Sequence, residues 1–203
     1  AAAKPAPAPG RHDPPSAGRS LDAGCARPTV IHPPASDLAP VVANAPAGTC
    51  FVLQAGQYWF HDVVPKDDMT FVGVDRNQVS VVGNSGTENA FHGTAARVSI
   101  GRMKFSGFTG SGGEKRQEQA AIRGTSKIWG TVPGTMAKEW LIEDVEVSGG
   151  YASGVFLGDD FTVRRSTFTN NGVTGIGGTE VHGGLIERNV ISGNGFQQAD
   201  GEY

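Results

Sequence analysis

The sequence predicts an all-β solenoid of stacked coils, and three observations support this prediction. First, one segment pattern recurs, with copies that open at Ile100, Ile142, Val163 and Ile186. Second, the 30 glycines among 203 residues suit a chain that turns often, because glycine enters tight turns without steric cost. Third, no segment after residue 45 keeps a 3.6-residue apolar period, so we expect little helix there.

The spacing of the copies indicates how the solenoid is built. The last three copies start 21 and 23 residues apart, and Ile100 lies 42 residues before Ile142. A β-branched unit of this length cannot bury its own apolar face, whereas stacked copies bury a continuous core. The side chains expected to face inward are Val98, Ile100, Phe105, Ile122, Ile142, Val147, Val155, Val163, Phe168, Ile176, Ile186 and Ile191.

Each copy must also bend. The apolar residue five positions after the opening residue has the wrong parity for one straight strand, so we expect bends near Val145, Ser166 and Asn189. Further strands are expected near Ile122, Val155 and Ile176, which makes three short strands per coil.

The N-terminal part differs from the repeats. Residues 1–20 are rich in Ala and Pro and predict a flexible leader. Residues 21–46 predict a cap segment, with a short helical turn over 38–42 that Ser36 and Asp37 can cap. Residues 47–203 predict the coils, with early strands over 50–53, 69–72, 79–82 and 98–100.

Cys25 and Cys50 are the only two cysteines. A bridge between them would tie the Pro-rich cap segment to the first strand, which is worth roughly 3 kcal/mol for a loop of this size. This pairing predicts an oxidising compartment. The alternative is two buried free thiols.

Net charge and the length of apolar runs indicate which classes of partner the sequence does not suggest. A formal charge of −3 is near neutral and does not suggest a nucleic-acid partner. No apolar run approaches the ~18 residues of a membrane span.

Residues 47–58 and 69–73 resemble the opening of right-handed parallel β-helix proteins of the pectin-lyase-like group, and residues 184–195 are similar to that group's coil repeat. The resemblance covers about residues 36–203. It implies a right-handed parallel β-helix with a short N-terminal helical cap. The group includes polysaccharide lyases, glycoside hydrolases, uronan epimerases, phage tailspikes and non-enzymatic surface proteins, so the resemblance does not determine a reaction.

The repeats end partway into a coil, at Tyr203. An open parallel edge exposes unpaired backbone groups, so the sequence predicts an incomplete solenoid whose last coil is covered by a second chain or by a C-terminal remainder. The alternative is that residues 196–203 fold over the edge as a short cap.

Several rows of equivalent residues are expected to be structural. Glu143, Arg164 and Glu187 predict a solvated charge ladder, and Asn171 and Asn194 predict an amide row that satisfies turn backbone. A hydroxyl row is expected at Ser106, Ser148, Thr169 and Ser192. The row of Arg102, Arg165 and Arg188 could also hold a carboxylated sugar chain through paired donors.

We expect a catalytic site at the turns between the strands, because insertions in solenoid proteins often gather on one face. Neighbouring carboxylates raise one another's pKa, so Asp159 and Asp160 are candidate catalytic residues, with His182 as a proton carrier. The alternative is structural: an Asp-Asp pair after glycine is ordinary turn composition, and a lone histidine in a loop is usually only solvated. The Asp-Asp pair followed by His-Gly is faintly similar to polygalacturonases, but their Asn-Thr-Asp and Arg-Ile-Lys motifs are missing. Candidate substrate-binding residues are Trp129, Lys138 and Glu180, with a rival site at Tyr151, Asp200 and Glu202.

The sequence therefore predicts a secreted carbohydrate-active protein: a lyase, hydrolase or epimerase acting on an extended polysaccharide. The carboxylates could also take Ca²⁺. The alternative is a non-catalytic surface, adhesion or assembly module of the same fold.

Overall fold

The computed structural model describes residues 14–22, 25–34, 38–84, 86–110, 119–125 and 136–195. In these ranges the helices are short, namely the 3-10 helix η1 (Pro15–Gly18) and the α-helix α1 (Leu38–Asn44). The strands are β1 (Thr29–Ile31), β2 (Cys50–Leu53), β3 (Gly56–Tyr58), β4 (Thr70–Gly73), β5 (Val79–Val82), β6 (Phe91–His92), β7 (Ser99–Ser106), β8 (Ala120–Arg123), β9 (Leu141–Ser148), β10 (Ser153–Phe156), β11 (Phe161–Arg164), β12 (Thr167–Thr169), β13 (Thr174–Gly177), β14 (Gly184–Glu187) and β15 (Val190–Ser192).

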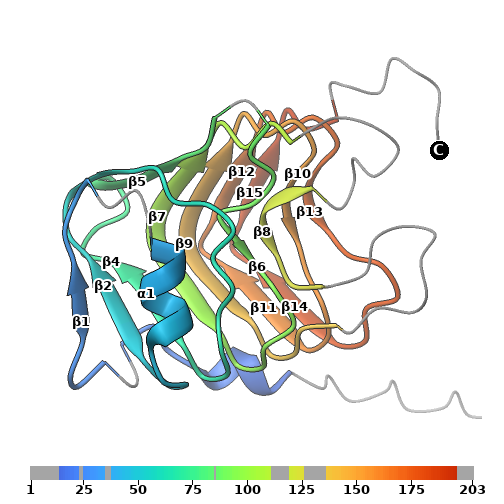
Figure 1. The fold of residues 1–203 in the computed structure, drawn as a ribbon. Coiled ribbons are helices and arrows are strands. Elements are labelled where there is room, and N and C mark those ends of the chain that lie inside the picture. The colour runs from blue at the N-terminus through green and yellow to red at the C-terminus, as the bar shows by residue number, and fades with distance from the viewer. Residues whose placement is uncertain are drawn as a thin grey trace, which may run out of the picture.

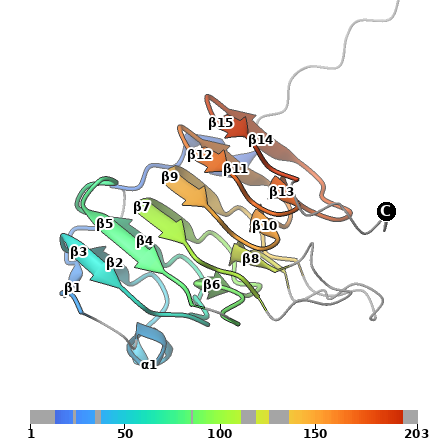
Figure 2. The same ribbon diagram turned by 90° about the horizontal axis from the view of Figure 1, so that it is seen from above.

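These strands form two sheets in which the strand pairs are parallel (Figure 1). In the larger sheet, here called sheet A, the main strand order is β1-β2-β4-β7-β9-β11-β14. In the smaller sheet, sheet B, the order is β13-β10-β8-β6. We number the coils 1 to 6 from the strands β2, β4, β7, β9, β11 and β14. Figure 2 shows the coils side by side in sequence order. The predicted parallel β-helix is confirmed.

Sheet A has two limbs that meet at a bend, here called corner 1. The first limb holds β2, β4, β11, β14 and the N-terminal halves of β7 and β9, and the second limb holds β3, β5, β12, β15 and the C-terminal halves of β7 and β9. Four residues in left-handed backbone, with φ of 52–56°, form corner 1: Arg102, Asp144, Arg165 and Arg188. A left-handed residue changes the strand direction, so the bends predicted near Val145, Ser166 and Asn189 are present, one residue earlier.

Two more corners are also formed by left-handed residues, corner 2 in coils 3 to 6 and corner 3 at each junction between neighbouring coils. Corner 2 follows the second limb and uses Gly107, Gly149, Asn170 and Gly193, residue types that tolerate this backbone. Corner 3 precedes the first limb and uses Asp68, Arg97, Glu139, Asp160 and Gly183. The backbone N–H of each of the first four corner 3 residues donates to a carbonyl of the next coil, at 2.8–3.0 Å.

The core runs through the stack as predicted. Nine of the predicted inward residues are buried: Val98, Ile100, Phe105, Ile122, Ile142, Val147, Val155, Val163 and Phe168. Ile176 is partly buried against the same core. Ile186 and Ile191 are about half exposed, because they lie in coil 6 and no described residue stacks on its far side. That a second chain or further residues cover this end stays a prediction.

The helix α1 lies at the N-terminal end of the stack (Figure 2). Its residues Leu38 and Val42 are buried in the same core as Phe51 of coil 1. The predicted helical turn is therefore present and extends to Asn44, whereas its proposed caps Ser36 and Asp37 lie outside the described residues. No helix in the described ranges has the length and apolar character needed to cross a membrane.

The cysteine prediction is confirmed, since Cys25 and Cys50 form a disulfide with a Cα–Cα distance of 5.3 Å. The leader prediction needs a correction. Residues 14–20, inside the expected leader, lie against the outward side of the first limb, where Ser16 is fully buried and Arg19 reaches backbone carbonyls. Side-chain hydrogen bonds to the sheet hold them there, which the Ala/Pro-rich composition did not indicate.

The amide row is confirmed as a structural device. Asn171 is fully buried, accepts the N–H of Gly150 (3.1 Å) and donates to the Oδ1 of Asn194 (2.9 Å) and to the carbonyl of Val147 (3.3 Å). Asn194 in turn donates to the carbonyl of Phe168 (3.0 Å). These bonds give hydrogen-bond partners to the turn backbone of Gly150 and to carbonyls near the ends of β9 and β12.

We expect Asn171→Ala to lower the free energy of unfolding by about 2–3 kcal/mol, because it removes buried hydrogen bonds to the backbone of Gly150 and Val147. Asn77→Ala, on an exposed turn between β4 and β5, should change it by less than about 0.5 kcal/mol. Chemical denaturation measures both variants. Equal, small changes would contradict the proposed role of the row.

Candidate functional site

The structure brings the three predicted catalytic residues to one edge of the solenoid. Asp159 and Asp160 end coil 4 at corner 3, and His182 lies beside them in coil 5. The Oδ1 of Asp159 is 3.5 Å from the Nδ1 of His182. The backbone N–H of Asp160 donates to the carbonyl of His182 at 2.9 Å.

The contacts of this trio are those of a turn. The Oδ1 of Asp159 accepts the backbone N–H of His182 at 2.8 Å, and the carboxylate of Asp160 occupies the space beside Gly183 that a Cβ would need. The His182 side chain is 87% exposed, so its contact with Asp159 competes with water. Both carboxylates thus hold the turn of the next coil in place, and their catalytic role stays a prediction.

The other predicted residues are divided between two edges. Lys138 is exposed beside Asp159 through backbone pairing, and Glu180 is exposed two residues before His182. Tyr151 lies beyond corner 2, at the opposite end of β10, and donates its backbone N–H to Phe108. Trp129, Asp200 and Glu202 lie outside the described residues.

The charged rows are paired on the first limb of sheet A. Arg102 contacts Asp22 at 2.8 Å, and Arg164 contacts Glu143 at 3.0 Å. Arg165 also pairs with Glu143, and only Arg188 of the arginine row has no ion pair among the described residues. The expected solvated ladder is wrong at Glu143, which is 6% exposed because residues 14–22 cover it.

A further cluster, which the sequence reasoning missed, lies at the C-terminal ends of the sheet B strands. Register places His92, Arg123, Phe156 and Gly177 in one row across coils 2 to 5. Neighbouring members of such a row are about 4.8 Å apart along the stack. The residues before them in β6 and β8, Phe91 and Ile122, are fully buried in the core.

The environment of His92 favours a neutral imidazole. Burial lowers the pKa of His92 below its ordinary value, and the Arg123 guanidinium lowers it further, against the opposing carboxylates of Asp62 and Glu88. The side chain is still 28% exposed, so a ligand can reach it. A neutral imidazole in reach of solvent can accept a proton near neutral pH.

Arg123 supplies the second half of the cluster. Its Nε is buried and has no hydrogen-bond acceptor among the described residues. A buried donor without an acceptor costs free energy, and a guanidinium edge matches a carboxylate by two parallel hydrogen bonds. The arrangement therefore leaves an unpaired guanidinium donor within one strand spacing of His92.

Asp62 lies on the coil 1 side of this cluster. Its carboxylate is 2.9 Å from the Nδ1 of His61 and 3.9 Å from the Nε2 of His92, and its backbone is left-handed with φ of 53°. Trp59, three residues earlier, is 45% exposed. An exposed indole is a surface on which a sugar ring can stack. We call His92, Arg123, Asp62 and His61 the sheet B cluster.

The sequence carried little signal for the sheet B cluster. β6 has only two residues, and the segments that lead to β6, β8 and β10 differ in length, so equal positions cannot be aligned by counting. The Phe91-His92 and Ile122-Arg123 pairs, each an apolar residue followed by a basic one, were the available hint.

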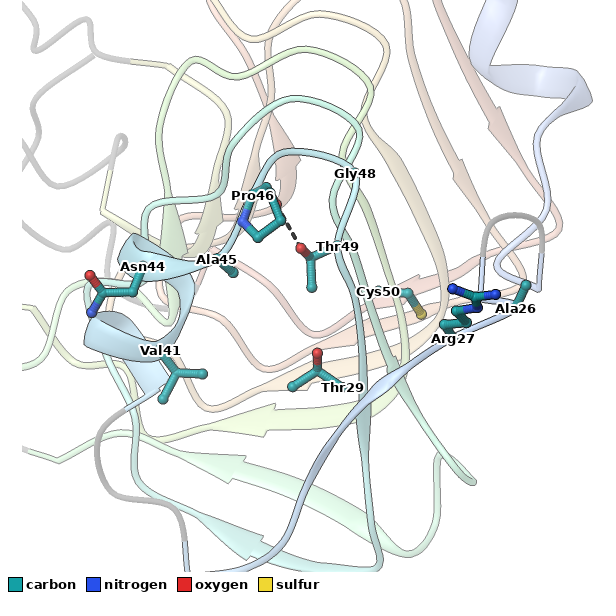
Figure 3. A pocket seen from close by; sticks show the side chains of 10 residues that line it. All are labelled: Ala26, Arg27, Thr29, Val41, Asn44, Ala45, Pro46, Gly48, Thr49 and Cys50. Carbon is teal, nitrogen blue, oxygen red and sulfur yellow. Dashed lines mark hydrogen bonds between the residues drawn. The ribbon is translucent and has the colours of Figure 1, made fainter.

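An open pocket lies elsewhere, at the N-terminal end, between α1 and the start of β2 (Figure 3). Arg27 is the charged side chain in its lining, beside Val41, Asn44 and Thr49. The Oγ1 of Thr49 already donates to the carbonyl of Pro46 at 2.6 Å. This lining offers no acid–base pair, so we assign it no chemistry.

Among the described residues, no three His, Cys, Asp or Glu side chains converge where a metal ion could bind. The Ca²⁺ prediction concerned the carboxylates of the turn at corner 3, Asp159, Asp160 and Glu180. It stays a prediction.

Comparison with known proteins adds a likeness of fold. No family model and no curated protein matches the chain. Among solved structures, it is similar to the A-module of the mannuronan C-5 epimerase AlgE4 from Azotobacter vinelandii, with 15% identity and a TM-score of 0.45 over 79% of this chain and 52% of that one. It is also similar to a pectin methylesterase in complex with a hexasaccharide, with 15% identity and a TM-score of 0.35 over 70% of this chain and 55% of that one. The chain thus spans about half the length of each, and likeness at this level does not indicate an activity.

The pKa of His92 can be measured directly. We expect NMR titration to find it below the ordinary value of about 6.5. Arg123→Gln should raise it and Asp62→Asn should lower it further, because each removes one neighbouring charge. Arg102→Gln, which removes a cation at corner 1, should leave it unchanged.

The same lowered pKa affects stability. Between the folded-state pKa and about pH 6.5 the unfolded chain binds more protons at this site, so the His92 contribution to stability is present above pH 6.5 and is lost as pH falls. Denaturation at pH 7 and pH 5 should show a smaller difference for His92→Gln than for the parent protein. An unchanged difference would contradict the burial of a neutral His92.

Proposed function

We propose that the protein is an exported carbohydrate-active enzyme that binds a carboxylated polysaccharide on the outer side of sheet B and abstracts the proton next to the carboxylate. His92 is the base and Arg123 holds the carboxylate. The observation that carries the proposal is the buried, unpaired Nε–H of Arg123 one strand spacing from an imidazole whose pKa is lowered.

The chemistry follows from that pair. A uronate sugar has an acidic C–H at C5, beside its carboxylate. His92 accepts the C5 proton, and the electron pair of the broken bond moves into the carboxylate, where the Arg123 charge stabilises it. Return of a proton to the other face of C5 gives an epimer. Cleavage of the C4–O bond instead gives an unsaturated sugar, and the departing oxygen takes up a proton.

The choice of sheet B as the binding face is supported by what covers the first limb of sheet A. Residues 14–22 lie across the outward side of the first limb, and Arg164 there donates to the carbonyls of Ala17 and Arg19. That side is therefore occupied by the chain itself. The row of His92 and Arg123 belongs to sheet B, on a different side of the coil.

The predicted trio at corner 3 remains the second candidate for a catalytic site. A hydrolase needs two carboxyl groups on either side of the glycosidic bond, within about 5–9.5 Å. Asp159 and Asp160 supply carboxyl groups, but both contact the turn of coil 5. Export is supported by the disulfide, which persists in oxidising compartments.

A non-catalytic binding module is the alternative function, and the many ion pairs favour it. Asp68 and Arg97 form two hydrogen bonds of 2.6 and 2.9 Å, and Lys104 pairs with Glu146 at 3.3 Å. Charges paired in this way serve stability and leave fewer groups for catalysis. A module of this kind would bind the polysaccharide through Arg123 and leave it unchanged.

The test is an assay of polygalacturonate, alginate and a neutral glucan for unsaturated sugars, new reducing ends and epimerised residues. We expect turnover of a carboxylated polymer only, with kcat reduced about 10²- to 10⁴-fold by His92→Gln. Arg123→Gln should raise KM and lower kcat. His182→Gln is the matched control and should retain activity.

The outcomes separate the candidates. Loss of activity in Asp160→Asn, with His92→Gln active, would overturn the His92 proposal and favour the corner 3 trio. Binding of carboxylated polymer without turnover, weakened by Arg123→Gln, would favour the module. Neither binding nor turnover of any carboxylated polymer would overturn the proposed function.

A further inference from the structure

The segment of residues 14–22, here called the arm, runs along the stack instead of around it. Its far end contacts the junction of coils 4 and 5, where the Oγ of Ser16 donates to the carbonyl of Asp160 (2.5 Å) and lies 2.8 Å from the Oγ1 of Thr162. Further along, Arg19 donates to the carbonyl of Glu139 (2.6 Å) and to the Oγ of Ser99 (2.8 Å). One short segment thus contacts several coils.

The near end of the arm is held by packing and by a covalent bond. Leu21 is buried against Val72, Leu141 and Cys50 and sits where a Cβ on Gly101 would be. Asp22 pairs with Arg102, and three residues later Cys25 is bonded to Cys50 at the start of coil 1. The contacts therefore run from coil 5 back to coil 1, in order along the arm.

The arm also closes over an ion cluster. Glu143 is 6% exposed and pairs with both Arg164 and Arg165. The two terminal nitrogens of Arg164 donate to arm carbonyls, at 2.8 Å to Ala17 and 2.6 Å to Arg19. Without the arm these charges would face water, and Arg164 would exchange its hydrogen bonds to arm carbonyls for hydrogen bonds to water.

We propose that the arm is a disulfide-locked strap that couples coils which do not touch one another. In a solenoid each coil contacts only its neighbours, so stability is close to a sum of local contributions. A strap fixed at coil 1 and at coils 4 and 5 adds a coupling between distant coils. Reduction of Cys25–Cys50 would release its near end and loosen its far contacts as well, which makes the strap sensitive to thiols.

The test is hydrogen exchange followed by mass spectrometry on the oxidised protein and on the same folded protein treated with a phosphine reductant. We expect reduction to speed exchange at least tenfold in peptides over residues 139–143 and 160–164, as well as in the arm itself. Changes confined to residues 25–53 would overturn the strap, because they would show a bond that acts only locally.

A variant cycle tests the coupling without depending on reduction alone. Ser16→Ala removes the far contact and leaves the disulfide intact, and Ser20→Ala is the matched control on the exposed side of the arm. The effects of Ser16→Ala and of Cys25→Ser/Cys50→Ser on exchange at residues 160–164 should be smaller together than the sum of each alone. Independent, additive effects would overturn the proposal. If the cysteine variant does not fold, chemical reduction of Ser16→Ala supplies the same comparison.

Discussion

The parallel register between coils, set by left-handed residues at three corners, is the constraint on which the rest of this structure depends. Corner 1 alone uses four such residues, each directly beside the next in the stack. A left-handed backbone disfavours most L-residues, so the chain accepts a local cost at each corner. Backbone hydrogen bonds between coils and the continuous core offset that cost. A slip of one residue would move apolar side chains outward and break the register of every later coil.

The register decides what each side chain meets. Phe51 and Phe71 stack in neighbouring coils with ring centroids 5.1 Å apart, and Phe71 lies 4.7 Å from Phe91. At the corners the same stacking places Asp68 beside Arg97, so charge pairs form between residues 29 positions apart. The main role of polar residues at these corners is therefore to stabilise the fold. The predicted carboxylates Asp159 and Asp160 belong to this class of contact.

We propose chemistry where the register leaves a polar group unsatisfied. His92 and Arg123 come from coils of unequal length, and the sheet B register makes them neighbours. The Nε atoms of Arg123 and Arg164 are both buried without an acceptor, but the terminal nitrogens of Arg164 donate to arm carbonyls and to Glu143, whereas those of Arg123 have no acceptor among the described residues. This difference between two half-buried arginines is the physical reason to place a ligand on sheet B. On the first limb of sheet A the arm takes the place that a ligand would need.

The sequence by itself determined the fold class, the inward columns such as Ile142 and Val163, the bends and the Cys25–Cys50 pairing, because apolar periodicity and cysteine count are local properties of the chain. Only the tertiary structure decided which polar residues meet. The arm around Ser16 was predicted as a leader because its composition carries no apolar pattern, yet hydrogen bonds to distant coils hold it in place. The sequence repeat did not reveal that His92 and Arg123 are neighbours, because the segments that separate equivalent strands differ in length. Their alignment is seen only in the strand pairing.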